Sequence, residues 1–171
     1  VAGKMCQASA PVSTHLNCAV AAAAAVGVRE ITITLGATNA VTADQYAEGT
    51  IHVNDVDGEG QTYRIKSHPA AAAAASLVVT LYDDLVTALT TSSEATLTKN
   101  PYDAVIVAPT ALTAQVVGVP LIPVTIAYYC WLQKRGVCAL LTQGVVVIGQ
   151  PVGLGGTADG ACGPVAADTT A

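Results

Sequence analysis

The sequence predicts an all-β fold, a sandwich or barrel of about ten short, mostly antiparallel strands with little helix. Several segments alternate apolar and polar residues with period two, as residues 30–35 do, where Ile31, Ile33 and Leu35 alternate with threonines. Turn-forming glycine, proline, asparagine and aspartate separate these segments at intervals of about a dozen residues. Both observations are typical of short strands joined by tight turns.

The first half of the chain contains the clearest hairpin. Residues 50–54 and 61–66 are predicted strands, and the turn 55–60 between them holds Asp57-Gly58. The five alanines 21–25 favour a helix by propensity. A strand hairpinned through Gly27 onto residues 30–35 is the alternative, and we favour it slightly. A second alanine run, residues 70–75, leads into a predicted strand at 77–82.

The second half is organised around residues 128–151. Further strands are predicted at 95–99, 105–107 and 116–119, and then the alternation through residues 124–133 predicts a two-faced strand. Turns at Lys134-Arg135-Gly136 and Gln143-Gly144 would return the chain through strands at 137–141 and 145–148. We therefore expect a β-meander here that forms the core hairpin of the protein.

The domain organisation expected from 171 residues is a single β-rich domain over residues 1–171. Residues 1–27 could instead form an extended N-terminal arm, and residues 153–171 are predicted to be a glycine-rich C-terminal loop and tail. Because the chain starts at Val1 and ends in a polar tail from Asp168, both ends look cut from something longer.

The composition is rich in hydrophobic residues, at 52%, and poor in charged ones, at 11%. A surface with so little charge suits a protein whose faces are covered by neighbours in an assembly. The net charge of −5 and the scattered basic residues argue against nucleic-acid binding. No apolar run approaches the ~20 residues of a membrane span, so we expect no membrane insertion.

The five cysteines are odd in number and lack the paired spacing of a thiolate metal site. Cys130 and Cys138 flank one predicted turn, and a change of register by one residue decides whether they face each other. Their redox state stays open, although buried, reduced thiols are the interpretation we favour.

Enzymatic and metal chemistry find little support in the sequence. Asp55, Asp57 and Glu59 resemble the start of a calcium loop, but the twelfth position of that pattern is Lys66 rather than an acid. We therefore interpret them as turn residues that are weak metal candidates at most. The three histidines, His15, His52 and His68, are isolated, and no nucleophile motif is present. We predict a protein that is not an enzyme and has no cofactor.

Four residues of the predicted meander are candidate interface residues. Tyr129 and Trp131 share one predicted strand face, and Lys134 and Arg135 occupy the adjacent turn. An aromatic pair of this kind could stack a sugar, but packing in a core or an interface is the interpretation we favour.

The order of the motifs resembles small virion proteins of tailed bacteriophages, the capsid decoration (cement or head-stabilising) family. The resemblance rests on Ala127-Tyr-Tyr-Cys-Trp-Leu-Gln133, Cys138-Ala-Leu-Leu and Gly149-Gln-Pro-Val152, preceded by Ile31-Thr-Ile-Thr-Leu-Gly36-Ala-Thr38, Gly58-Glu-Gly60, Thr62-Tyr-Arg-Ile-Lys66-Ser-His68 and Asn100-Pro101-Tyr102. Each motif is only a turn with an alternating strand, so their order from about residue 30 onward carries the resemblance.

The resemblance implies a structural virion protein that binds the outside of an assembled shell and stabilises it. Its partner would be the major capsid protein, with a homo-oligomer, most often a trimer, assembled in the host cytoplasm and located on the capsid surface. Relatives continue beyond Asp168 into a final apolar strand, and without that strand an edge would lie open for another chain. The alternatives are another virion component, such as a tail, fibre or minor shell protein, and a self-assembling β-rich surface or fibrous protein.

Overall fold

The computed structural model describes residues 2–165 and confirms the all-β prediction. Where one domain was expected, the chain divides into two compact units. The barrel unit is Pro11–Asn100, and the sheet unit consists of the described residues in 2–10 and 101–165. Cys6–Gln7 (β1) lies in the sheet unit and Cys18–Ala22 (β2) in the barrel unit, so residues 2–27 contribute to both.

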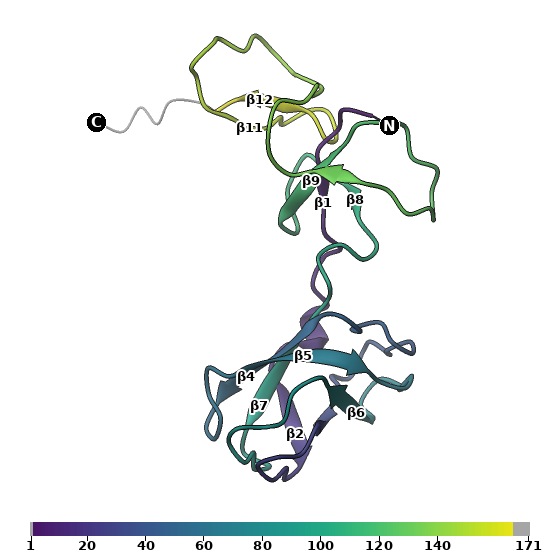
Figure 1. The fold of residues 1–171 in the computed structure, drawn as a ribbon, viewed down its shortest axis with the longest axis vertical. Helices are drawn as coiled ribbons and strands as arrows, with labels where there is room; N and C mark the ends of the chain where they lie inside the picture. The colour runs from purple at the N-terminus through teal and green to yellow at the C-terminus, as the bar shows by residue number, and fades with distance from the viewer. Residues whose placement is uncertain (1, 166–171) are drawn as a thin grey trace, which may run out of the picture. The chain divides into compact units, whose positions relative to one another are not determined.

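Six antiparallel strands form the barrel unit (Figure 1), and their ladders close in the order β2-β3-β6-β5-β4-β7. After β2 these are β3 (Glu30–Thr34), β4 (Thr50–Asp55), β5 (Thr62–Ser67), β6 (Ser76–Leu81) and β7 (Glu94–Thr98). A single turn of 3-10 helix, η1 (Ser13–His15), precedes β2. Closure leaves none of these strands with an open edge, which removes the usual route to strand-by-strand association.

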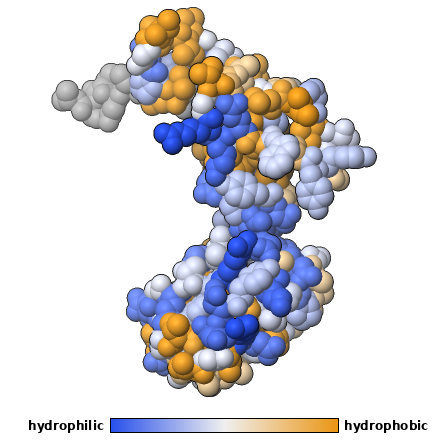
Figure 2. All heavy atoms as spheres, in the orientation of Figure 1, coloured by the Kyte–Doolittle hydropathy of each residue, from blue (hydrophilic) through white to orange (hydrophobic). Residues whose placement is uncertain are grey.

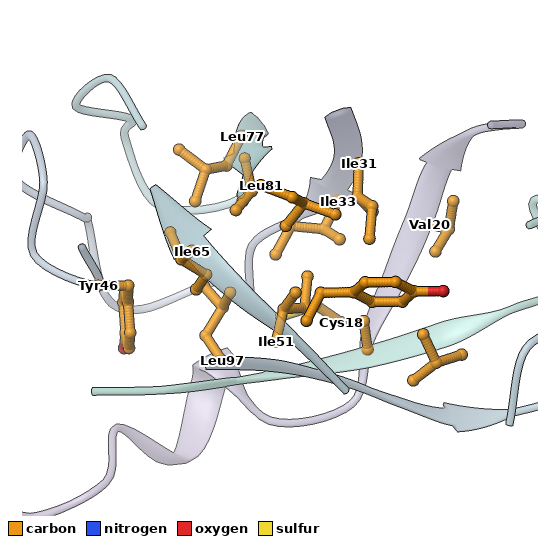
Figure 3. Close-up of a cluster of buried hydrophobic side chains, with 14 of the residues drawn as sticks. Cys18, Val20, Ile31, Ile33, Tyr46, Ile51, Ile65, Leu77, Leu81 and Leu97 are labelled. Carbon is orange, nitrogen blue, oxygen red and sulfur yellow. The ribbon is translucent and has the colours of Figure 1, made fainter. Parts of the chain in front are cut away.

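Period-two alternation builds the barrel core. Ile31 and Ile33 of β3, Ile51 of β4 and Ile65 of β5 are fully buried, while their sequence neighbours face outward. Figure 3 shows these side chains together with Leu77 and Leu81 of β6 converging inside the unit. Burying each such side chain contributes about 1.5–3 kcal/mol, so this cluster is the main source of stability in the unit.

The favoured interpretation of the first alanine run is confirmed in part, for Ala21 and Ala22. Cys18–Ala22 pairs with β3 through Val20↔Ile33 and Ala22↔Thr32, and the chain reverses at Gly27, whose φ is +86°. Tertiary pairing thus overrides the helix propensity of alanine. The hairpin of β4 and β5 is also confirmed, with Ile51 opposite Tyr63.

The sheet unit contains a small four-stranded sheet in the order β10-β9-β1-β8. Its strands beside β1 are β8 (Ile106–Val107), β9 (Val116–Pro120) and β10 (Leu132–Gln133). A small apolar cluster of Cys6, Ala8 and Val117, with Leu132 packed against it, joins the strands. This unit therefore has much less core than the barrel unit.

Of the glycine-rich loop and tail predicted over residues 153–171, residues 166–171 lie outside the described residues, and the prediction for the rest is wrong in part. Val152–Leu154 (β11) and Cys162–Pro164 (β12) pair as an antiparallel hairpin, with Gly153 opposite Gly163. Glycine lacks a side chain to pack but keeps both backbone hydrogen-bonding groups, so a glycine-rich segment can still form a ladder.

The predicted β-meander at 128–151 is also wrong. Within it only Leu132–Gln133 forms a strand, and residues 137–141 and 145–148 do not. The alternation that begins at residue 124 is interrupted where Tyr128 N–H bonds the Thr125 carbonyl and Ala127 adopts a φ of +64°. Alternation defines the two faces of a strand but does not supply a neighbour to pair with, and here only β9 does so.

Candidate functional site: an exposed apolar surface on the sheet unit

The aromatic segment, residues 121–133, presents its large side chains to solvent. Trp131 is 95% exposed and Tyr129 is fully exposed, as is Val137 beyond the turn. Figure 2 shows hydrophobic residues gathered over much of the sheet unit. These aromatic side chains bury about 150–250 Å² each when covered, so two of them alone approach the largest apolar patch of an ordinary monomer, about 300–600 Å². A surface of this kind indicates an interaction site.

The aromatic segment also encloses a shallow hollow of about 610 Å³. Residues 121–125 and 128–133 line it, and the lining is mostly apolar. At the base of the segment, β10 anchors it to β9 through Leu132↔Pro120 and Gln133↔Val119. The aromatic segment is therefore paired with the sheet at one end and exposed at its aromatic residues.

Charge is almost absent from this surface. Between residues 104 and 158 the only charged side chains are Lys134 and Arg135. Lys134 Nζ donates a hydrogen bond to the Tyr102 hydroxyl and lies 4.9 Å from the centre of its ring. The Arg135 carbonyl accepts a hydrogen bond from Gln133 Nε2 at 3.1 Å. The two residues thus hold the turn after β10 in place, and Arg135 is exposed beside the aromatic segment.

The two units differ in charge. The barrel unit carries nine acidic and four basic side chains and so contributes the whole net charge of −5. The sheet unit carries three of each sign over its full sequence. A partner of the sheet unit would therefore be recognised by shape and apolar contact more than by charge.

The structure places the candidate interface residues in one region but not as predicted. Tyr129, Trp131, Lys134 and Arg135 all lie in or next to the aromatic segment, yet Tyr129 and Trp131 belong to no regular strand. No described residue of this unit covers them, so of the two interpretations that the sequence left open, packing in the core of the unit is not seen.

The structure describes all five cysteines as free thiols. Cys130 is exposed and Cys138 is half-buried, and no disulfide joins them. Cys6, Cys18 and Cys162 are buried, and burial raises the pKa of the Cys6 and Cys18 thiols. A raised thiol pKa lowers the fraction of reactive thiolate, so these two behave as small apolar residues.

Asp55, Asp57 and Glu59 lie at the turn between β4 and β5. Asp55 Oδ1 accepts the Val56 amide at 2.8 Å, and Asp57 Oδ2 accepts the Thr90 hydroxyl at 2.9 Å. Among residues 2–165 no group of three acidic, histidine or cysteine side chains is placed to hold a metal ion. The turn interpretation accounts for the contacts of both aspartates.

Sequence reasoning missed a buried cluster in the barrel unit that joins His15, Tyr46 and His68. Nδ1 of His15 lies 2.6 Å from the Tyr46 hydroxyl, while Nε2 lies 3.1 Å from the Asn39 carbonyl. The Tyr46 amide donates to Nε2 of His68 at 2.9 Å, so the other His68 nitrogen, Nδ1, carries the proton and donates to the Pro69 carbonyl. All three side chains are buried.

This cluster is structural in character. Burial raises the pKa of Tyr46 to about 12, so the phenol stays neutral at ordinary pH. The imidazole nitrogens of both histidines have hydrogen-bond partners inside the unit, which leaves no free group facing an open pocket. His52 lies apart from them, bonded to the hydroxyls of Thr50 and Thr62 at 2.9 Å each. No local sequence pattern could have revealed the cluster, because its members are separated by 31 and 22 residues.

No helix in the described residues is both long and apolar enough to cross a membrane. Comparison of the chain with protein-family models, with curated proteins and with solved structures gave no match.

Proposed function

We propose that this protein is a structural virion protein that binds the outside of a phage capsid shell and stabilises it. The observation that carries the proposal is the exposed, nearly uncharged aromatic segment of the sheet unit. A protein that works alone in solution has no use for an uncovered Trp131 beside an uncovered Tyr129, whereas a protein that binds a preformed surface does. Tryptophan and tyrosine are also enriched among the residues that dominate interface energies.

The order of the sequence motifs supports a shell of major capsid protein as the surface to which this protein binds. In this proposal the aromatic segment contacts the shell, with Lys134 and Arg135 at the rim of the contact. The barrel unit has a closed sheet, a filled core and the acidic charge, and these are properties of a unit that faces solvent. The role is non-enzymatic and needs no cofactor, nucleic acid or membrane, and the protein would sit on the capsid surface after assembly in the host cytoplasm.

A self-assembling β-rich surface or fibrous protein is the second candidate, because β10 is an edge strand of its sheet. Sedimentation separates the two functions. The purified protein is mixed with expanded capsid shells that lack any decoration protein, and the shells are pelleted. Co-sedimentation with saturation at a fixed number of copies per shell supports the proposal. Failure to pellet with shells contradicts it, and fibres formed without shells favour the second candidate.

A further inference from the structure

The edge strand β10 continues into a stretch of unpaired backbone. On one side, β10 bonds to β9 through Leu132↔Pro120 and Gln133↔Val119. On its outer side, and for Tyr129, Cys130 and Trp131 before it, no backbone hydrogen bond reaches another described segment. An exposed sheet edge with free N–H and C=O groups is a template for an added strand.

A second segment of the same unit resembles a strand but has no strand to pair with. Residues 145–148, the valine segment, are Val-Val-Val-Ile, which is the composition of a strand buried in a sheet. Val145 is 82% exposed and Ile148 is fully exposed. Among the described residues, the backbone bond made here is the local turn from Gln150 N–H to the Val147 carbonyl. The valine segment thus has the composition of a strand but no pairing neighbour in residues 2–165.

The flanks of the valine segment allow it to reach a neighbour. Gly144 and Gly149 bound it with φ values of +75° and +88°, and no atom lies close enough to Gly149 to obstruct even a methyl group there. Glycine adopts these angles at no steric cost, so both ends can turn. Neither segment contains a charge that would oppose pairing.

We propose that the valine segment of one copy adds as a strand to the outer edge of residues 129–133 of a second copy, and that the reciprocal contact forms a two-fold dimer. A second copy is the favoured occupant because the chain itself carries both the open edge and the unpaired strand. In the reciprocal contact, the valine segment of each copy pairs with residues 129–133 of the other copy. The same pair of surfaces therefore meets twice, as in any closed two-fold interface.

Main-chain hydrogen bonds along the edge and the apolar side chains of the valine segment would hold such a dimer together. Strand addition occupies the backbone edge and leaves the side chains of Tyr129 and Trp131 to the shell contact. The dimer is therefore compatible with shell binding and does not depend on it.

Cysteine cross-linking tests the proposal without shells. One chain keeps Cys130 and carries Cys138→Ser. A second chain, with a different tag, carries Cys130→Ser and Cys138→Ser together with one of V145C, V146C, V147C or I148C. The two chains are co-expressed, oxidised gently and separated on a non-reducing gel. All four positions lie in an exposed segment, so each variant should keep the wild-type melting temperature.

The expected result is a mixed disulfide dimer at alternate positions, either 145 and 147 or 146 and 148, because side chains of a strand alternate between faces. Paired thiols in a complex react at an effective concentration of about millimolar, so at about 10 µM protein the rate should exceed random collision roughly 100-fold. V137C in the second chain is the matched control, since Val137 is fully exposed in the same unit.

Two results would overturn the inference. They are cross-linking rates no higher than that of the V137C control, and equal rates at all four positions. Shell binding is not involved in any of these measurements. A failure here therefore leaves the proposed function standing, and a failure of shell sedimentation leaves the dimer standing.

Discussion

The hydroxyl of Tyr46 lies 2.6 Å from Nδ1 of His15 inside the barrel unit, where both residues are buried. The two rings meet edge to face, with centroids 5.6 Å apart. Because His15 comes from η1 and Tyr46 from the loop before β4, this contact ties two connecting segments of the barrel unit together. Polar contacts of this kind cost free energy when one partner is removed, because the other stays buried without a hydrogen bond.

Tyr46→Phe is expected to destabilise the barrel unit by about 1–3 kcal/mol, since His15 Nδ1 would lose its partner in the interior. Urea unfolding followed by circular dichroism measures the change. Tyr82→Phe is the matched control because the Tyr82 hydroxyl bonds Glu48 at the exposed surface, and it should shift stability by less than about 0.5 kcal/mol. Equal effects of the two variants would contradict the role assigned to the cluster.

Alkaline pH should weaken the barrel unit through Tyr46. Its pKa is about 12 in the folded protein because burial disfavours the phenolate, against 10.0 for an unperturbed tyrosine. The unfolded chain therefore loses this proton first. The contribution of Tyr46 to the free energy of unfolding is fully present below pH 10 and is lost between pH 10 and 12. The loss amounts to roughly 2–3 kcal/mol. Unfolding curves of wild type and Tyr46→Phe as a function of pH should converge over this range. Parallel curves would show that Tyr46 does not titrate as described.

Core and surface positions should respond differently to truncation. Ile33→Ala in β3 removes a fully buried side chain and is expected to cost about 2–5 kcal/mol. Val137→Ala removes a fully exposed one and should cost less than about 0.5 kcal/mol. Thermal unfolding measures both. A large loss of stability in Val137→Ala would show that Val137 is buried, as the predicted meander requires.

Calcium should leave the melting temperature unchanged, because Asp55 and Asp57 already accept hydrogen bonds within the protein. A ligand that bound only the folded state would raise the melting temperature. Asp57→Ala should lower stability by about 0.5–1.5 kcal/mol, since the Thr90 hydroxyl loses its acceptor. Melting with added calcium and with chelator checks the first expectation. A calcium-dependent increase abolished by Asp57→Ala would instead assign a metal to this turn.

The barrel unit was largely predictable and the sheet unit was not. In β3 and in the β4–β5 hairpin, alternation, turn residues and burial agree, so the pattern of Ile31 and Ile33 was enough to locate the strand and its inner face. Around Trp131 the same alternation occurs without a pairing partner, and the large side chains of the predicted core hairpin are exposed. The His15–Tyr46 contact could not be predicted, because pairing across 31 residues depends on how the barrel closes.

The charge-poor composition predicts faces that are covered by neighbours, but it does not say where on the molecule they lie. Only the structure shows that the low charge is concentrated in the sheet unit, while the barrel unit carries the acidic residues. Assigning Tyr129 and Trp131 to an interface rather than to a core therefore rests on their exposure in the structure. The sequence alone left these two interpretations open.

The central claim is that the aromatic segment binds the shell, and co-sedimentation of two variants with bare expanded shells tests it most directly. Trp131→Ala should weaken binding about 30-fold or more, as expected when a central interface tryptophan worth about 2 kcal/mol is removed. Tyr82→Ala, which removes an exposed aromatic from the barrel unit, should bind as wild type does. Undiminished binding of Trp131→Ala, with a loss in Tyr82→Ala, would contradict the account and move the binding surface to the barrel unit.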